Sequence, residues 1–433
     1  MERSRLLISL LNSLIFSVFK LRGLLKFILN DRVIETSEAT GITLLDFIRY
    51  QQQLTGTKIG CREGDCGACS ILVGSLENNN VTYRSATSCL MPLANAAGKH
   101  IVTIEGINGK KLTPVQEAFA SEGATQCGFC TPGFIVSLTG YCLSTPAHRP
   151  NSAIESVNGN ICRCTGYKSI ERAAEHIEFL LAQRKDTDAL QYAMAHDVVP
   201  AYFASIPERL AHLVQPPSAA TGKMVGGGTD LYVQQHDVMP HTAIRPLSQE
   251  VALKYIREEN GYCLIGAGAT VTDLAESPII QRILPNLGQP IKLVSSTPIR
   301  NMATLAGNLV NASPIGDFSI MLLALDARIK LESPSGSRMV PLRHFYKGYK
   351  QLDKVPDEVV TEISFPISSL QRVFQFDKVC KRTYLDIASV NVAINLELNN
   401  GIIESAGLAA GGVAPVPAFL SNASGWLTGQ PVS

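Results

Sequence analysis

The stretch that decides the fold is GCREGDCGAC at residues 60–69, which is followed at a distance by Cys89. Its spacing, C-x4-C-x2-C with a remote fourth cysteine, is that of plant-type 2Fe–2S ligation. The interleaved glycines let the backbone wrap closely around a compact inorganic cluster. A zinc knuckle is the alternative, but zinc sites usually pair two short hooks. We therefore predict a 2Fe–2S cluster held by Cys61, Cys66, Cys69 and Cys89.

Two short cysteine hooks follow further along the chain, CGFC at 127–130 and CRC at 162–164. Taken alone they allow a zinc site or a redox-active CxxC pair as well as a second cluster. Pro132, just after the first hook, suits the first turn of a helix. We expect both hooks to lie at helix N-termini, where the helix dipole favours thiolates, and to face one cluster. The predicted ligands of this second cluster are Cys127, Cys130, Cys162 and Cys164.

Length and composition limit the remaining possibilities. A chain of 433 residues predicts two to four domains. Its hydrophobic fraction of 45% and charged fraction of 17% can build cores and argue against disorder. Because 38 Lys and Arg balance 37 Asp and Glu, we expect no nucleic-acid partner that binds through a basic surface. Eleven cysteines are too few for a disulfide scaffold, and Cys142, Cys263 and Cys380, which have no spacing partners, are expected to be buried small hydrophobes.

Periodicity predicts several local elements. Alternation around turn residues predicts hairpins over 26–35 and 390–409. Short strands are predicted over 71–73 and 81–84. Helices are predicted over 43–53, 114–121, 132–143 and 168–182.

The two ends of the chain read differently from the rest. An apolar run occupies residues 6–26, and we expect residues 1–24 to be an extension or a mis-called start, with a membrane-associating segment as the alternative. The C-terminus stops just after a helix-like segment has begun, so we expect the last subdomain to be truncated.

The second half carries a glycine triplet and a segment rich in small and amide residues. Gly226, Gly227 and Gly228 follow a strand-like stretch, and such a backbone can approach a pyrophosphate. This is not the Rossmann fingerprint, because Leu231 stands at the third glycine position. A plain tight turn is the alternative for the triplet alone. Residues 298–317 can present backbone donors and amide groups to a large polar ligand.

The runs GCREGDCGAC, TQCGFCTPGF and GNICRCTGYKSI, together with VGGGTDLY, resemble the iron–sulfur and FAD region of the xanthine dehydrogenase and molybdenum hydroxylase family. The resemblance implies an α+β multidomain fold with a β-grasp, plant-type ferredoxin domain and a four-helix 2Fe–2S domain. It also implies an α+β FAD-binding domain of the PCMH type and a partial α+β C-terminal flavoprotein subdomain. The corresponding ranges are 25–106, 107–184, a linker at 185–200, 201–369 and 370–433.

The resemblance also implies which residues contact the cofactors. Gln126 would touch the pterin of a molybdenum cofactor. One departure from the family is that residues 292–297, shortly before Thr304, contain no aromatic side chain to lie over the flavin. The implied FAD contacts are Met224, Val225, Gly226, Gly227, Gly228, Thr229, Asp230, Leu231, Thr304, Leu305, Ala306, Gly307, Asn308, Asp317, Val360 and Lys378.

The function that the resemblance implies is electron transfer as the small, iron–sulfur and FAD, subunit. Electrons would pass from a partner's molybdenum cofactor through two 2Fe–2S clusters to FAD and on to NAD, while hypoxanthine and xanthine are oxidised to urate. We expect no catalytic residue on this chain, a molybdopterin-binding large subunit in a heterotetramer or larger assembly, and a cytoplasmic location. The alternatives are the equivalent subunit of a hydroxylase for aldehydes, nicotinate or another N-heterocycle, or a non-enzymatic iron–sulfur redox protein.

Overall fold

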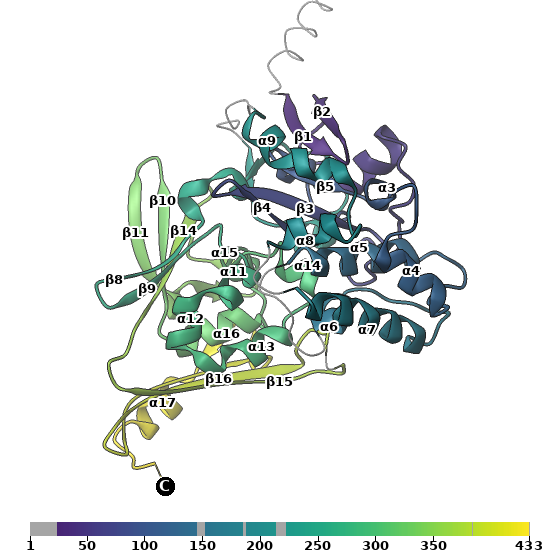
Figure 1. Cartoon of the computed structure of the whole chain (residues 1–433). Helices are drawn as coiled ribbons and strands as arrows, with labels where there is room; N and C mark the ends of the chain where they lie inside the picture. The colour runs from purple at the N-terminus through teal and green to yellow at the C-terminus, as the bar shows by residue number, and fades with distance from the viewer. Residues whose placement is uncertain (1–23, 145–151, 185–187, 214–221, 383, 433) are drawn as a thin grey trace, which may run out of the picture.

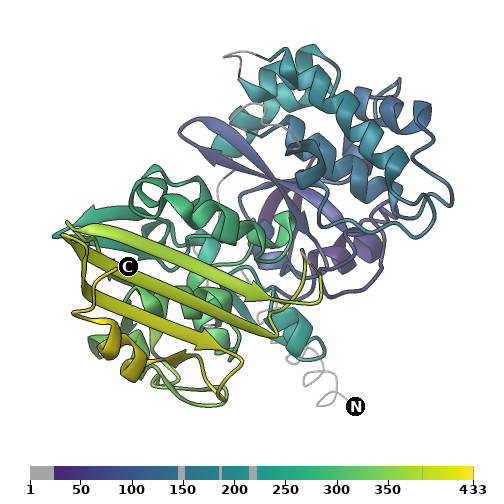
Figure 2. The same cartoon turned by 90° about the horizontal axis from the view of Figure 1, so that it is seen from below.

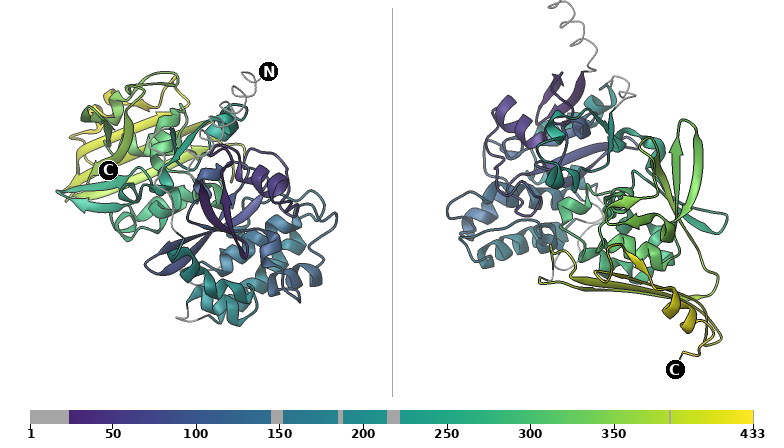
Figure 3. Two further views of the ribbon diagram at one scale, coloured as in Figure 1. Left: turned by 90° about the horizontal axis from the view of Figure 1, so that it is seen from above. Right: turned by 180° about the vertical axis from the view of Figure 1, so that it is seen from behind.

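The polypeptide forms two lobes that lie side by side in every view (Figures 1 and 3). The predicted extension at residues 1–24 falls outside the described residues except for Leu24. In the ranges that are described, no helix combines the length and the apolar character that crossing a membrane requires. The computed structural model describes residues 24–144, 152–184, 188–213, 222–382 and 384–432.

The first part of the N-terminal lobe is a mixed sheet in the order β2-β1-β5-β3-β4, in which β1 and β5 run parallel. The predicted hairpin over 26–35 is confirmed, with Asn30 in a left-handed conformation (φ 52°) at its turn. The helix predicted over 43–53 is also confirmed, and Thr43 caps it by accepting from the Asp46 N–H. The elements are β1 (Leu25–Leu29), β2 (Arg32–Thr36), α2 (Leu44–Asp46), the π-helical turn η1 (Phe47–Gln51), β3 (Ser70–Glu77), β4 (Asn80–Thr87), η2 (Leu93–Ala96), β5 (His100–Val102) and α3 (Ile104–Ile107). This is the β-grasp arrangement that the resemblance implied.

Four helices pack together beside this sheet, and the predicted helices over 114–121, 132–143 and 168–182 are confirmed. The first helix begins where a capping box forms between Thr113 and Gln116, with Pro114 in the first turn. The fourth helix, over 168–182, is amphipathic, with Ile170, Ala173 and Ile177 buried. The helices are α4 (Pro114–Ser121), α5 (Thr131–Cys142), α6 (Ser152–Ser156) and α7 (Lys168–Ala182).

The stretch predicted as a linker at 185–200 is packed structure from residue 188 onward. It contains α8 (Ala189–Ala195), which Asp188 caps by accepting from the Gln191 N–H. Tyr192 is buried in the same core as the four helices, and its hydroxyl donates to Leu180 O at 2.7 Å. Because the buried side chains cover only two turns, their periodicity is too short to stand out in the sequence. The turn η3 (Ala201–Ser205) and α9 (Ile206–Ala211) continue this packing onto the β-grasp sheet.

The C-terminal lobe begins with a small parallel pair, β6 (Lys223–Val225) and β7 (Ile244–Pro246), joined through α10 (Leu231–Gln234). An antiparallel sheet follows in the order β11-β10-β14-β9-β8. Its strands are β8 (Ile256–Glu259), β9 (Tyr262–Gly266), β10 (Arg328–Ser333), β11 (Gly336–Pro341) and β14 (Val359–Pro366). The main helices of this lobe are α11 (Val271–Glu276), α12 (Pro278–Ile283), α13 (Gly288–Lys292), α14 (Thr297–Arg300), α15 (Leu305–Asn311) and α16 (Asp317–Ala324).

A last antiparallel sheet, in the order β15-β16-β17-β18, closes the C-terminal lobe, and Figure 2 shows it from outside. The helix α16 covers its inner face so closely that a Cβ on Gly407 would lie 2.1 Å from Ala324 O. The hairpin predicted over 390–409 is confirmed, with Gly401 at φ 79° in its turn. The elements are β15 (Gln371–Val379), β16 (Val390–Asn399), β17 (Ile402–Gly411), β18 (Ala418–Phe419) and α17 (Ser421–Leu427).

One hydrophobic core is shared by the two lobes. It contains Phe27 and Leu44 from the β-grasp sheet and its helix, and Val225, Tyr232 and Met302 from the C-terminal lobe. Burial of this shared apolar surface, rather than a linker, holds the two lobes against each other. The sites described next therefore lie at fixed positions relative to one another.

Candidate functional site

The first cysteine set lies in the loop between η1 and β3 and just beyond β4. Its thiols form two hydrogen-bonded pairs, Cys61 with Cys66 and Cys69 with Cys89. The loop directs a backbone N–H group at a sulfur: Glu63 N donates to Cys61 Sγ at 3.3 Å. The hydrogen bond from Cys66 lowers the pKa of the Cys61 thiol to about 5. The first pair is therefore prepared to supply one thiolate at neutral pH, and thiolates are the soft ligands that iron–sulfur clusters take.

An ion pair that the sequence did not suggest anchors this loop. Arg62 adopts φ 59° and donates from its two terminal nitrogens to the Asp46 carboxylate, at 3.0 and 2.6 Å. The hydrogen bonds and charge of Arg62 outweigh burial and hold the pKa of Asp46 below its ordinary value. The contact ties the cysteine loop to α2. No local sequence signal pairs residues so far apart along the chain.

The second cysteine set lies on the helical domain. Cys127 Sγ lies 3.6 Å from Cys164 Sγ, and Cys130 is hydrogen-bonded to Cys162. The structure thus brings the two hooks together as predicted. Cys127 and Cys164 are exposed and Cys162 is buried. Gln126, expected to touch a pterin, is exposed beside Cys127.

The expected position of the hooks at helix N-termini is right for one of them. Cys130 is the N-cap of α5. The second hook, in contrast, ends before α7, whose N-cap is Tyr167 (φ 70°). The expectation was wrong there because the left-handed turn at Gly166 and Tyr167 separates the thiols from the helix. Side-chain and backbone donors of Thr165 reach Cys162 Sγ instead, at 3.1 and 3.4 Å.

The thiols of each set lie in pairs rather than converging on one point. Across the described residues, no group of three or more His, Cys, Asp or Glu side chains takes up the geometry of a single-ion site. Two pairs of thiols per set match what a two-iron cluster requires, because each iron takes two of the four cysteine ligands. The donor set and its pairing therefore fit a 2Fe–2S cluster in each domain.

The two cysteine sets adjoin where α5 meets the first cysteine loop. A Cβ on Gly133 would lie 2.3 Å from Gly67 O, so helix and loop backbones are in direct contact. Ile161 N donates to Cys66 O at 3.0 Å. The loop that carries the first set is therefore hydrogen-bonded to the segment that carries the second.

The glycine triplet connects β6, which contains Met224 and Val225, to α10, which begins at Leu231. Each glycine faces another backbone or capping group. A Cβ on Gly226 would lie 2.7 Å from Thr304 Oγ1, and one on Gly227 would lie 2.1 Å from Met302 O. The triplet is thus required for packing, and the two predicted FAD stretches, 224–231 and 304–308, lie against each other.

The third glycine of the triplet faces the first cysteine set. Gly228 adopts φ 82°, and a Cβ there would lie 2.6 Å from the carbonyl oxygen of Leu90, the residue after Cys89. The N–H groups of Gly227, Gly228 and Thr229 donate to no described residue. Unpaired N–H groups of successive residues are donors suited to phosphate oxygens. The loop therefore fits the diphosphate of FAD.

The next FAD stretch forms the start of α15. Thr304 caps the helix by accepting from Gly307 N at 3.1 Å, and Leu305 and Ala306 are buried. Asn308 Oδ1 is buried and has no hydrogen-bond partner among the described residues. A buried polar atom without a partner costs stability unless a ligand satisfies it. Asn308 is thus a group that a bound FAD would satisfy.

The remaining predicted FAD residues lie around this segment. Asp230 caps no backbone group but accepts from Asn311 Nδ2 at 2.7 Å, and burial raises the pKa of its carboxyl. Val360 is buried on β14, opposite Leu331.

Asp317 and Lys378 form a buried ion pair. Lys378 Nζ on β15 lies 2.8 Å from Asp317 Oδ2 at the start of α16, and the lysine side chain is 2% exposed. Asn391, which the sequence analysis missed, donates to Asp317 Oδ1 at 2.6 Å. No sequence signal marked it, because the apolar alternation that begins with Val390 and Val392 predicts that Asn391 lies on the opposite, polar face, whereas the structure buries it.

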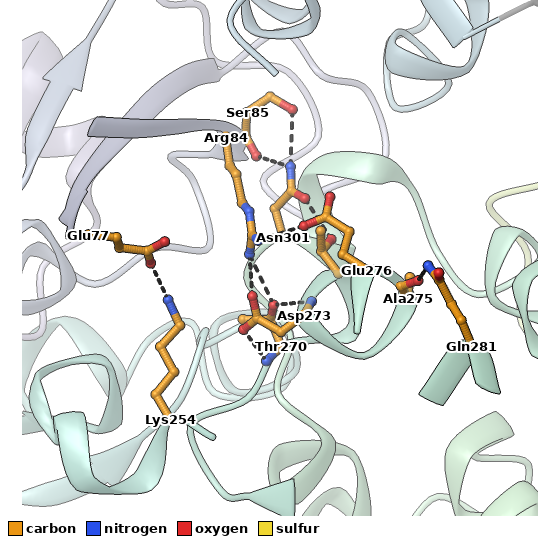
Figure 4. Close-up of polar contacts among 11 residues, drawn as sticks. Glu77, Arg84, Ser85, Lys254, Thr270, Asp273, Ala275, Glu276, Gln281 and Asn301 are labelled. Atoms are coloured by element: carbon orange, nitrogen blue, oxygen red, sulfur yellow. Dashed lines mark hydrogen bonds and ion pairs between the residues drawn. The ribbon is translucent and has the colours of Figure 1, made fainter. Parts of the chain in front are cut away.

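Polar contacts also join the β-grasp sheet to the C-terminal lobe (Figure 4). Arg84 on β4 reaches two carboxylates on α11, Asp273 at 2.7 Å and Glu276 at 2.9 Å. Burial opposes ionisation of Asp273, but the charge and hydrogen bonds of Arg84 prevail and its pKa lies below the ordinary value. Lys254 and Glu77 form a second, exposed pair nearby at 2.6 Å. These contacts join the edge of the β-grasp sheet, at β3 and β4, to the C-terminal lobe.

Comparison with protein families matches four domains in the order that the fold shows. Residues 27–94 match the family described as "2Fe-2S iron-sulfur cluster binding domain" and 103–175 match "[2Fe-2S] binding domain". Residues 200–368 match "FAD binding domain in molybdopterin dehydrogenase" and 376–433 match "CO dehydrogenase flavoprotein C-terminal domain". The chain thus carries two 2Fe–2S-binding domains and an FAD-binding domain.

Two curated relatives and one solved structure show the range of similar proteins. A xanthine dehydrogenase of Emericella nidulans is 29% identical over 94% of this chain and 35% of its own length. An aldehyde oxidase 4 of Cavia porcellus is 25% identical over 94% of this chain and 36% of its own length. A carbon monoxide dehydrogenase of Hydrogenophaga pseudoflava is 27% identical, over 49% of this chain and 74% of that chain, at a TM-score of 0.45. The chain spans about a third of the length of the two curated relatives.

Proposed function

The chain belongs to the molybdenum hydroxylase family as an iron–sulfur and FAD portion that transfers electrons, and from this premise we propose that it connects a molybdenum centre on a partner subunit to NAD. The proposed reaction of the assembly is the oxidation of hypoxanthine and xanthine to urate. The xanthine dehydrogenase relatives, 28–29% identical over 92–95% of this chain, support this substrate class.

The cofactor ligands follow from the geometry of the two sites. Cys61, Cys66, Cys69 and Cys89 would hold one 2Fe–2S cluster, and Cys127, Cys130, Cys162 and Cys164 the other. The N–H groups of 227–229 would bind the FAD diphosphate. The buried Oδ1 of Asn308 would accept a hydrogen bond from the same ligand. When bound, the clusters supply one-electron steps and FAD converts them to the two-electron step that NAD requires.

The observation that carries the proposal is that the two segments bearing the first cysteine set touch the segments of both neighbouring sites. On one side Cys66 O accepts from Ile161 N, which precedes Cys162. On the other side Leu90, which follows Cys89, adjoins Gly228 of the predicted diphosphate loop. These two contacts support a series of three sites with the first cysteine set in the middle.

The exposed face of the second set indicates where electrons enter. Cys127 and Cys164 are exposed, and Phe129 and Ile161 beside them are 47% and 42% exposed. Apolar side chains next to exposed thiols suit a surface that a partner covers. We place the molybdopterin-binding subunit there, with Gln126 facing its pterin.

Reconstitution with a molybdopterin-binding subunit tests the proposal. With xanthine as substrate, urate formation and NAD reduction should proceed together and should require both cysteine sets. The chain alone should transfer electrons from NADH to an artificial acceptor and should oxidise no xanthine. Xanthine oxidation by the isolated chain would refute the relay, whereas an assembly that oxidises aldehydes and not purines would assign the substrate class of the aldehyde oxidase relatives.

A further inference from the structure

A buried asparagine joins the two cysteine-bearing segments. Asn160 is 6% exposed, and its Nδ2 donates to Gly67 O at 3.1 Å and to Ser70 Oγ at 3.4 Å. Its Oδ1 accepts from Ser137 Oγ on α5 at 2.8 Å. Because a carbonyl oxygen can only accept, the amide nitrogen must face Gly67, and the orientation of the side chain is settled. Asn160 thus bridges the β-grasp domain and the helical domain.

The hydrogen bond of Asn160 is one of two that run side by side. Asn160 reaches Gly67 O, and the next residue, Ile161, donates its N–H to Cys66 O at 3.0 Å. Cys66 belongs to the first cysteine set, and Ile161 is bonded directly to Cys162 of the second. The connection between the two sets therefore consists of covalent bonds interrupted by a single hydrogen bond.

The space around these two bonds is closely filled. A Cβ on Gly67 would lie 2.4 Å from Asn160 Nδ2 and 2.4 Å from Gly159 O. Removing the amide donor of Asn160 would leave the buried Gly67 carbonyl with the two donors of Ser70, its N–H at 3.1 Å and its Oγ at 2.7 Å, and without the only one of the three that comes from the helical domain. A negative oxygen in the same position would also repel that carbonyl. The adjoining Cys66–Ile161 hydrogen bond would lengthen in either case.

We propose that Asn160 is a positioning residue for electron transfer between the two cysteine sets, which it serves by holding the Cys66–Ile161 hydrogen bond at its length. The proposal rests on the proposed function, since it presumes a cluster in each set. One electron crosses the bridge in each event, so that one set is oxidised and the other reduced by one electron. No covalent bond changes and no proton crosses. The electron comes from NADH through FAD in the experiment below, and from the molybdenum side in the assembly.

The chain offers a closely matched control at its other domain contact. Asn301 Nδ2 donates to Ser85 O at 2.8 Å and to Ser85 Oγ at 3.4 Å, while its Oδ1 accepts from Thr272 Oγ1 at 2.7 Å. It joins the β-grasp sheet to the FAD-binding domain, as Figure 4 shows. The same substitution can thus be made in the same kind of contact, but away from the junction of the two cysteine sets.

The test compares Asn160→Asp with Asn301→Asp in the full, cofactor-loaded chain. Electron paramagnetic resonance of the dithionite-reduced protein measures the magnetic interaction between the two clusters. Freeze-quench spectra after mixing with NADH measure how fast each cluster is reduced. Ser137→Ala, which removes the donor to Asn160 Oδ1 and introduces no charge, is a milder second variant.

We expect Asn160→Asp to keep its iron, sulfide and FAD but to lose much of the magnetic interaction between the two clusters. After mixing with NADH, its second set should be reduced several-fold more slowly than that of the wild-type chain. Asn301→Asp should keep the interaction, and any slowing should affect the reduction of both sets alike, because the second set receives its electrons through the first. Asn160→Asp with full cofactor content and an unchanged interaction would overturn the proposal. If that variant does not load its clusters, an unchanged interaction in Ser137→Ala overturns it equally. A wild-type protein without two cluster signals would instead overturn the proposed function.

Discussion

Replacing Lys378 with methionine tests the buried ion pair in the C-terminal lobe. Lys378 Nζ lies 2.8 Å from Asp317 Oδ2 and donates to Leu293 O at 3.0 Å. Methionine fills similar space but carries no charge. The side chain of Asp317 is 10% exposed. Its carboxylate would keep the hydrogen bond from Asn391 and lose its counter-charge.

The expected cost follows from that burial. Removing one partner of a buried ion pair typically costs about 3–5 kcal/mol, because the remaining charge is left uncompensated. Against a usual total stability of about 5–15 kcal/mol, this would be a large loss. The matched control is Lys330→Met, because the Lys330–Glu332 pair is 38% and 41% exposed. Exposed pairs contribute only about 0–1 kcal/mol.

The assay is hydrogen exchange of the amides of β15, β16 and β17 in FAD-depleted protein, since exchange reports the free energy of local opening. FAD is removed so that a lost ligand contact does not add to the loss of stability. The double variant Lys378→Met with Asp317→Asn removes both charges and should recover most of the stability. The reasoning is refuted if Lys378→Met costs no more than Lys330→Met, or if the double variant is as unstable as the single one.

Three further predictions concern the other sites. Gly227→Ala should lose FAD, because its Cβ would lie 2.1 Å from Met302 O, whereas Gly288→Ala, with nothing within 4 Å, should keep it; flavin absorbance decides. Arg84→Met should lower the melting temperature at neutral pH. The folded-state pKa of Asp273 lies below 3.8, so the difference in melting temperature between the variant and the wild-type chain should persist down to that pH. It should vanish only as the pH falls through the folded-state pKa, and thermal unfolding measured across pH tests this. Cys164→Ser should abolish one cluster signal and leave NADH oxidation with an artificial acceptor intact; a joint loss would contradict the serial order.

The sequence contained enough information to predict the elements that depend on local order. The cysteine spacing over 60–69, the hairpin turns at Asn30 and Gly401, and the capped helix at Pro114 are each encoded in a few consecutive residues. The structure confirms these elements. It also brings together the two cysteine hooks and the two predicted FAD stretches, although their assignment as ligands stays a prediction.

Contacts between distant segments could not be predicted in this way. Arg62 with Asp46 joins two separate segments of the β-grasp domain, and Asn160 with Gly67 and Arg84 with Asp273 join residues whose pairing depends on how whole domains pack. The steric reason for a glycine could not be predicted from the sequence either. The sequence suggests that Gly227 leaves room for a phosphate, but the structure shows that a Cβ at this position would also collide with the backbone of Met302. A glycine required by the chain itself and one required by a ligand look the same in a sequence.

The central claim is that each set of four cysteines holds one 2Fe–2S cluster beside an FAD site. Purified protein, reconstituted with iron and sulfide, can be assayed for iron, acid-labile sulfide, zinc and flavin, and its reduced form examined by electron paramagnetic resonance. The account predicts about four iron and about four sulfide per chain, one FAD, and two distinguishable cluster signals. Stoichiometric zinc with little sulfide, or a single cluster signal from protein in which all eight cysteines are intact, would contradict it.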